Sequence, residues 1–198
     1  MTGALVILLH GVGSRGADIA GLATHWQDRL PDTAFAAPDG PFAFDQAPSG
    51  RQWFSVRNVT DANRAERIVA AREAFDRVLA RHVADHGFED RLDRVTLVGF
   101  SQGSIMALDA AVSGRWPVKA VVAFSGRLAS PLPFASPPAT RFALIHGRND
   151  PVIPVAESER AAVLLRDAGA DVRLHICEGL GHAISPEAAL IAEAFLTE

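Results

Sequence analysis

Six short segments of the chain are almost entirely apolar, and longer segments with a helical spacing of apolar residues separate them. Near-continuous apolar runs of this length are typical of parallel strands that are covered on both faces. The six segments are Ala4–Leu9, Thr33–Ala37, Arg94–Gly99, Val118–Phe124, Arg141–His146 and Val172–Cys177. We therefore expect a parallel sheet of about six or more strands.

The clearest helical pattern covers Ala65–His86, and Gly87 follows it as a plausible helix end. Its apolar residues recur at helical spacing, with Arg or Glu on the other face: Ile68, Ala71, Phe75, Val78, Leu79 and Val83. Strands that alternate with helices predict a doubly wound α/β sheet with right-handed crossovers and helices on both faces. In such sheets, ligands bind beyond the carboxyl ends of the strands.

Two segments interrupt this alternation, namely Pro38–Gln52 and Ser130–Thr140, and both are rich in proline. Neither is long enough to link two domains, so we interpret both as surface loops. The length of 198 residues suits one domain with a substantial core. We therefore expect residues 1–198 to form a single α/β domain.

Composition and charge exclude several classes of protein. The chain is 48% hydrophobic and carries a formal net charge of -4, so neither disorder nor a nucleic-acid partner is expected. The opening apolar run is short and lacks a basic start, which predicts a cytoplasmic protein with no signal peptide and no membrane span. Cys177 is the only cysteine, and no H-E-x-x-H or C-x-x-C motif is present, so we expect no metal and no disulfide.

A nucleophile motif follows the third predicted strand. Gly99-Phe-Ser-Gln-Gly103 lies directly after that strand and directly before a helical pattern, which is the context of the G-x-S-x-G nucleophile elbow. The sharp turn leaves no room for side chains at the two glycine positions and exposes the hydroxyl of Ser101 at a helix N-terminus. A glycine-flanked serine in an ordinary strand-to-helix turn is the alternative.

A serine hydroxyl needs a base, and the base needs an orienting carboxylate. In sheets with this elbow, the acid and then the histidine follow the serine along the chain. Asp150 follows the fifth predicted strand and His182 follows the sixth, so both point to the edge of the sheet where Ser101 lies. Asn149 and Glu178 are rival orienting groups. We predict a catalytic triad of Ser101, Asp150 and His182.

The loop after the first strand contains a G-x-G-x-x-G pattern at Gly11, Gly13 and Gly16. This pattern also occurs in dinucleotide-binding proteins, but His10 occupies the strand end and no acid stands at the expected distance outside a proline-containing loop. An oxyanion hole needs two backbone donors. We predict that the amides of Val12 and Gln102 supply them, because the first and third strands become neighbours where the winding of the sheet reverses.

Two aromatic residues follow the Pro38–Gln52 loop. Trp53 and Phe54 are candidates for the wall of a substrate pocket, and packing of the loop onto the core is an equal alternative. His10 and His146 each precede a glycine near the expected site, where hydrogen bonds to loops are a simpler role than reaction.

With these motifs identified, the chain resembles the carboxylesterase/phospholipase family of α/β-hydrolases, which includes acyl-protein thioesterases and bacterial short-chain carboxylesterases. The matching segments are LLHGVGS, APDGPF, GRQWFSV, GFSQGS, HGRNDPVIP and GLGHAI, in family order along almost the whole chain. The resemblance implies an α/β-hydrolase fold, hydrolysis of carboxylic esters without a cofactor, and the same triad and oxyanion hole. Two departures are a shorter segment before the first strand, and Ser55 where the family often has aspartate.

We therefore expect a serine carboxylesterase that cleaves small or short-chain acyl esters through an acyl-enzyme, with a small-molecule ester as its partner. Its activity should fall at acidic pH as His182 becomes protonated. A thioesterase or lysophospholipase acting on long acyl chains is an alternative, as is a non-catalytic binding module with the same fold. The natural substrate and the oligomeric state are not predicted.

Overall fold

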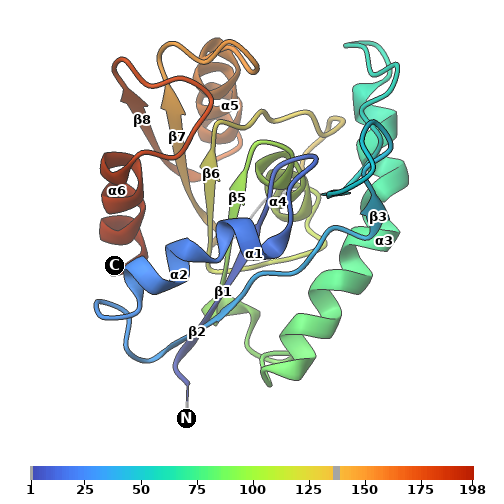
Figure 1. Ribbon diagram of the computed structural model, residues 1–198. Helices are drawn as coiled ribbons and strands as arrows, with labels where there is room; N and C mark the ends of the chain where they lie inside the picture. The colour runs from blue at the N-terminus through green and yellow to red at the C-terminus, as the bar shows by residue number, and fades with distance from the viewer. Residues whose placement is uncertain (1, 136–138) are drawn as a thin grey trace.

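The computed structural model describes residues 2–135 and 139–198. Six parallel strands form a twisted sheet in the order β2-β1-β5-β6-β7-β8 (Figure 1). Their bounds are Ala4–Leu9 (β1), Thr33–Ala36 (β2), Val95–Phe100 (β5), Ala120–Phe124 (β6), Arg141–Gly147 (β7) and Asp171–Cys177 (β8). This is the doubly wound parallel sheet that the sequence predicts, and the strand ends differ from the expected ones by at most two residues.

In the described residues, six α-helices lie between or after the strands and cover both faces of the sheet. Their bounds are Gly16–Ile19 (α1), Gly21–Trp26 (α2), Arg64–Asp85 (α3), Gln102–Val112 (α4), Ala156–Asp167 (α5) and Pro186–Leu196 (α6). Helix α3 lies one residue from the predicted Ala65–His86, and Gly87 follows it with a φ of 72°, a backbone conformation that glycine adopts without strain.

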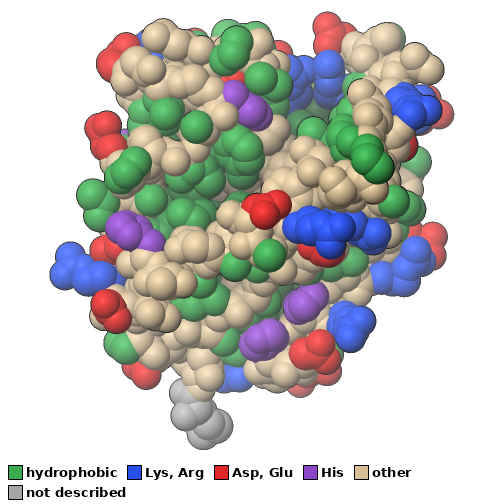
Figure 2. All heavy atoms as spheres, viewed as in Figure 1, with side chains coloured by type: hydrophobic (Ala, Val, Ile, Leu, Met, Phe, Trp, Pro, Cys, Tyr) green, Lys and Arg blue, Asp and Glu red, His purple; other side chains and the backbone are tan. Residues whose placement is uncertain are grey.

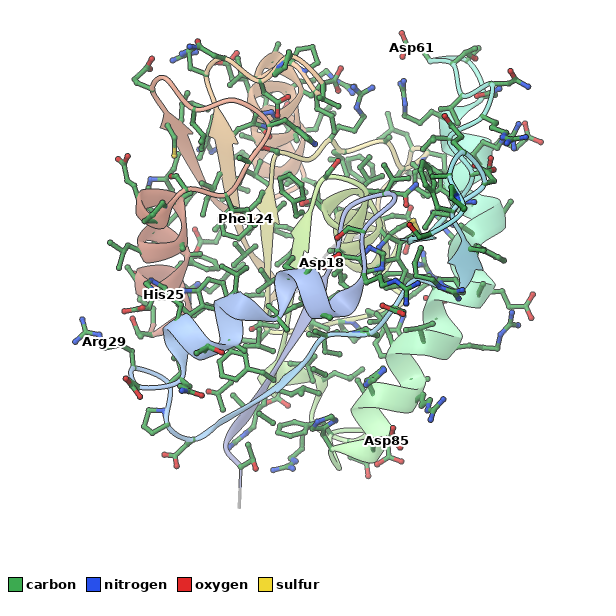
Figure 3. All side chains as sticks on the ribbon, in the orientation of Figure 1. Asp18, His25, Arg29, Asp61, Asp85 and Phe124 are labelled. Atoms are coloured by element: carbon green, nitrogen blue, oxygen red, sulfur yellow. The ribbon has the colours of Figure 1, made fainter. Side chains whose placement is uncertain are left out.

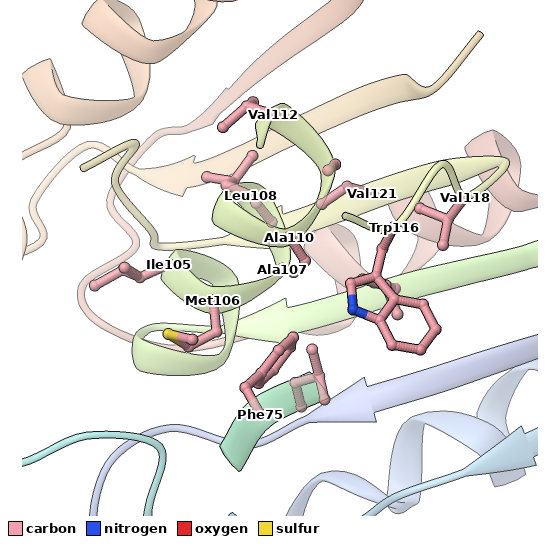
Figure 4. Packing of buried hydrophobic residues seen from close by; sticks show 14 of the residues in the cluster. Phe75, Ile105, Met106, Ala107, Leu108, Ala110, Val112, Trp116, Val118 and Val121 are labelled. Carbon is pink, nitrogen blue, oxygen red and sulfur yellow. The ribbon is translucent and has the colours of Figure 1, made fainter. Parts of the chain in front are cut away.

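The core consists of two apolar clusters, one on each face of the sheet, because side chains of successive strand residues point to opposite faces. Within β1, Leu5 and Ile7 belong to the cluster with α3, α4 and α5, whereas Val6 and Leu8 belong to the cluster with α1, α2 and α6. Helix α4, directly after the elbow, is buried along its whole length and packs against Phe75 of α3 (Figure 4). The elbow is therefore held by the most enclosed helix of the fold.

The two predicted loops differ from each other in structure. Pro38–Gln52 contains a short antiparallel hairpin, β3 (Phe42–Ala43) with β4 (Arg51–Gln52), which the sequence did not predict. In Ser130–Thr140, residues 136–138 lie outside the described part, and the described residues contain neither helix nor strand. A short 3-10 turn, Leu92–Arg94, leads into β5 in place of the first predicted strand residue.

The winding of the sheet reverses between β1 and β5, as predicted. These strands are neighbours, with Leu9 opposite Gly99, so the loops after both strands emerge side by side. On the face of the molecule shown in Figure 2, acidic and basic side chains are interspersed. Among the described residues, no helix is both long and apolar enough to cross a membrane.

Candidate active site

Ser101 lies in a strained turn between β5 and α4. Its φ of 52° and ψ of -113° place a non-glycine residue in a conformation that L residues rarely adopt. A Cβ atom on Gly99 would lie 2.4 Å from the backbone of Gly103, and one on Gly103 would lie 2.1 Å from the carbonyl oxygen of Leu9. The turn therefore requires glycine at both positions, as the motif indicates, and it places Ser101 at the N-terminus of α4.

Three side chains from distant loops form one hydrogen-bonded chain at this point. The Oγ atom of Ser101 lies 3.0 Å from Nε2 of His182, and Nδ1 of His182 lies 2.7 Å from Oδ2 of Asp150. Both distances are within the range of a hydrogen bond. Since Nδ1 faces a carboxylate, it carries the ring proton and leaves Nε2 free to accept the proton of the serine hydroxyl.

The carboxylate of Asp150 is buried but well bonded. Its Oδ1 atom accepts hydrogen bonds from the backbone N–H groups of Val152 and Ile153 at 2.8 and 2.9 Å, and its Oδ2 atom accepts a hydrogen bond from Nδ1 of His182. Burial raises the pKa of this carboxyl, but these hydrogen bonds outweigh burial and hold the pKa below its ordinary value. Asp150 therefore remains ionised at neutral pH and orients the histidine.

A second, fully buried histidine contacts the same carboxylate, a contact that the sequence did not reveal. Nε2 of His146 lies 3.2 Å from Oδ2 of Asp150 and 2.8 Å from the carbonyl oxygen of Ile153. Both neighbours accept hydrogen bonds, so Nε2 carries the proton, and Nδ1 accepts from the hydroxyl of Ser158 at 2.7 Å. His146 thus fixes the loop that carries the acid.

The predicted oxyanion loop lies against the elbow. A methyl group on Gly11 would lie 3.1 Å from the ring of Phe100 and 3.5 Å from Cβ of Ser101, so the backbone after β1 approaches the serine closely. Among the described residues, the amides of Val12 and Gln102 donate to no protein acceptor. Two unused backbone donors beside a serine are what an oxyanion requires.

His10 holds this loop in place with both ring nitrogens. Nε2 accepts the N–H of Gly40 at 2.8 Å, and Nδ1 donates to the carbonyl oxygen of Gly11 at 2.7 Å. The ring is buried, and burial lowers its pKa below the ordinary value, although the bond to Gly11 and nearby carboxylates act in the opposite direction. The His10 ring is therefore neutral, and its two hydrogen bonds hold the loop in place.

The side chain of Gln102 ties the aromatic segment to the elbow. Its Oε1 atom accepts the N–H of Trp53 at 2.8 Å, and its Nε2 atom donates to the carbonyl oxygen of Phe54 at 2.7 Å. The indole N–H of Trp53 donates to the carbonyl oxygen of His10 at 2.9 Å. Both aromatic side chains are buried in the core cluster with Phe75, which gives them a packing role beside the oxyanion loop.

Among the described residues, neither rival orienting group, Asn149 or Glu178, forms a hydrogen bond with the His182 ring, which bonds Asp150 and Ser101 instead. The backbone of Asn149 donates to Leu180, and the carboxylate of Glu178 is exposed and pairs with Arg148 at 3.2 Å. Within the described residues, no group of three or more His, Cys, Asp or Glu side chains is arranged to hold a metal ion.

Ser55, where the resemblance led us to expect aspartate, forms a hydrogen bond with a carboxylate of the neighbouring hairpin loop. The hydroxyl of Ser55 donates to Oδ2 of Asp45 at 2.5 Å, and this bond is the main cause that holds the pKa of the Asp45 carboxyl below its ordinary value.

Comparison with known proteins assigns the chain to a family. The sequence model of one family, described as phospholipase/carboxylesterase, matches residues 2–198. The chain belongs to the phospholipase/carboxylesterase family. The chain is similar to esterase YpfH of Escherichia coli, with 37% identity over 180 residues that span 91% of this chain and 76% of that protein.

The chain is similar to two further proteins. Acyl-protein thioesterase 1 of Neurospora crassa is 27% identical over 213 residues, which span 98% of this chain and 86% of that protein. The crystal structure of esterase PE8 superposes with a TM-score of 0.88 at 38% identity and covers 98% of this chain and 92% of its own. The phospholipase/carboxylesterase family thus places the chain among the carboxylesterases and thioesterases with the α/β-hydrolase fold.

Proposed function

We propose that the protein is a serine carboxylesterase in which Ser101, His182 and Asp150 form the catalytic triad and short acyl esters are the substrates. The chain of contacts from Ser101 Oγ through the His182 ring to Asp150 carries this proposal. Similarity at 37–38% identity to two proteins named esterases supports an ester as the substrate. The sequence identity to an acyl-protein thioesterase is lower, at 27%, and makes a thioester the second candidate substrate.

The geometry fits a two-step reaction. Oγ of Ser101 attacks the ester carbonyl carbon while Nε2 of His182 takes the hydroxyl proton. The carbonyl oxygen becomes an oxyanion, and the amides of Val12 and Gln102 donate to it. The C–O bond to the alcohol then breaks, and the alcohol leaves with the proton from His182. Water repeats the sequence on the acyl-serine and releases the acid.

The remaining contacts support these roles. The negative charge of Asp150 stabilises the imidazolium that forms in each step, and the Nδ1–H bond keeps the ring in the required tautomer. Helix α4 begins at Gln102, so its N-terminal amides also face the developing charge.

The test is the variant Ser101→Ala assayed with p-nitrophenyl acetate and butyrate. We expect turnover to fall by at least about 10³-fold, because the remaining donors cannot replace the nucleophile. A fluorophosphonate probe should label the parent protein at Ser101 and leave the variant unlabelled. Unchanged turnover in the variant would exclude this mechanism, and absence of labelling in the folded parent would favour a non-catalytic module.

A panel of esters graded by acyl length, with matching thioesters, separates the two candidate functions. A maximum at short acyl esters supports the carboxylesterase. Higher kcat/KM for long-chain thioesters would replace it with a thioesterase, with the same triad in the same roles.

A further inference from the structure

Two cavities adjoin the histidine side of the triad, on the face of the sheet that carries α1, α2 and α6. The nearer one has a volume of about 310 Å³ and is lined by His182, by Gly11 of the predicted oxyanion loop and by Phe100, whose ring lies 4.9 Å from the His182 ring. The farther one has a volume of about 400 Å³. Asp18, Ile19 and Ile184 line both, so the cavities meet and form one groove that leads away from His182. We call this the α2–α6 groove.

The α2–α6 groove is mainly apolar. Ile19, Leu22, Ile184 and Ala189 provide its walls, and Figure 2 shows hydrophobic side chains gathered in a hollowed strip of this face. Two of its polar side chains, Asp18 and His25, are exposed on α1 and α2 (Figure 3). The other polar residues that line it are His10, Ser14, His182 and Ser185. No lysine or arginine is among the described residues that line either cavity. The groove therefore suits an uncharged, apolar group rather than an anion.

The position of the groove relative to the triad identifies which part of an ester it faces. In the proposed reaction, the carbonyl oxygen points to the amides of Val12 and Gln102. The alcohol oxygen must lie next to Nε2 of His182, because that nitrogen returns the proton to it. The chain of the alcohol continues from this oxygen, and the groove begins at His182 and continues along Ile184.

We propose that the α2–α6 groove binds the alcohol portion of the substrate, and that this portion is an uncharged alkyl or aromatic group. This inference rests on the proposed function. It adds that selectivity for the alcohol is set by α1, α2 and the loop before α6, and is independent of selectivity for the acyl group. Each methylene of the alcohol that becomes buried in the groove raises kcat/KM by about fourfold.

The chain offers a variant that fills the groove with little disturbance. Gly21 lines the farther cavity, and a Cβ atom at this position would meet nothing within 4 Å. Gly21→Leu should therefore fold and narrow the groove, whereas Gly21→Ala is the matched control. Ile184→Ala removes an apolar wall that both cavities share. Leu190→Ala is its control, since Leu190 is exposed on α6 and does not line the groove.

The experiment uses two ester series and the intact chain. In the first, acetate esters of methanol, butanol and hexanol vary the alcohol; in the second, p-nitrophenyl esters vary the acyl chain. Gly21→Leu should lower kcat/KM for hexyl acetate about tenfold or more and leave methyl acetate unchanged. It should leave the acyl-length profile of the second series unchanged, because all of its members share one alcohol.

The outcomes separate the inference from the function on which it rests. A shifted acyl-length profile with an unchanged alcohol series would mean that the groove holds the acyl chain, and no change in either series would mean that it holds neither. Both results overturn the inference while fluorophosphonate labelling of Ser101 still supports the esterase. If the parent hydrolyses no ester and is not labelled, the proposed function and the inference fail together.

Discussion

The side chain of Gln102 provides the sharpest test of how the elbow is held. Its amide group bonds the backbone N–H of Trp53 and the backbone C=O of Phe54, and all of these groups are buried. Gln102→Ala leaves both backbone groups without a partner, at a cost of about 1–3 kcal/mol each. We therefore expect the free energy of unfolding to fall by about 2–6 kcal/mol, and Tm to fall by about 4–24 °C for a chain of this size.

The measurement is urea unfolding at pH 7, followed by tryptophan fluorescence and by far-UV circular dichroism. Gln102→Glu serves as a matched control, because a carboxylate still accepts from Trp53 but faces the carbonyl oxygen of Phe54 without a proton. When protonated, the carboxyl can donate to that oxygen as the amide does. The stability deficit of Gln102→Glu should therefore shrink as pH falls towards 4.

A loss below about 0.5 kcal/mol for Gln102→Ala would refute the reasoning, since surface substitutions have effects of that size. A deficit of Gln102→Glu that does not depend on pH would also contradict it. In that case the contacts to Trp53 and Phe54 would not contribute to the stability of the elbow.

Three further predictions concern single side chains. Asp150→Asn should lower kcat for p-nitrophenyl acetate by about 10³–10⁴-fold, because an amide no longer holds the ring tautomer, and a loss below tenfold would contradict this. The buried carboxylate of Asp109 accepts hydrogen bonds from Arg72 and Arg115. Burial raises the pKa of this carboxyl, but the Arg72 hydrogen bonds and the charges of both arginines outweigh burial and hold the pKa below its ordinary value. Asp109→Asn should lower the free energy of unfolding at pH 7 by about 3–5 kcal/mol, and this difference should diminish below about pH 4, where the parent loses the contribution as the carboxyl takes up a proton; a constant difference in acid titrations would argue against it. Because the pKa of His10 is lowered in the folded chain, the unfolded chain binds a proton at this ring below about pH 6.5 while the folded chain does not. Urea titrations should therefore show the free energy of unfolding falling as pH decreases in that range, and falling less steeply in His10→Gln. Equal pH dependence in the two proteins would contradict the conclusion that the His10 ring is neutral in the folded chain.

The strand segments could be predicted because parallel strands buried on both faces leave an apolar run in the sequence. Arg141–His146 differs from β7 by one residue, and Ala4–Leu9 matches β1. The hairpin of β3 and β4 could not be predicted in this way, since strands of two residues are too short for any periodicity. Turn residues alone do not distinguish such a hairpin from an irregular loop.

The candidate triad could be named from the sequence because each member follows a strand, and parallel strands place their carboxyl ends at one edge. The contacts around it could not. His146 faces Asp150 only because the chain turns back within four residues, and His10 reaches Gly40 across a gap of 30 residues. Such bonds depend on side-chain positions that segments remote in sequence set jointly, so they leave no spacing pattern.

The position of β8 in the sheet has a consequence for the order in which activity appears during folding. β8 ends the strand order, paired with β7, and the loop that follows it supplies His182. In the mechanism proposed above, a refolding chain whose interior strands have already assembled remains inert until this outermost strand docks. Recovery of ester hydrolysis therefore reports the docking of β8 at its edge of the sheet, whereas fluorescence from the buried tryptophans reports the formation of the two core clusters.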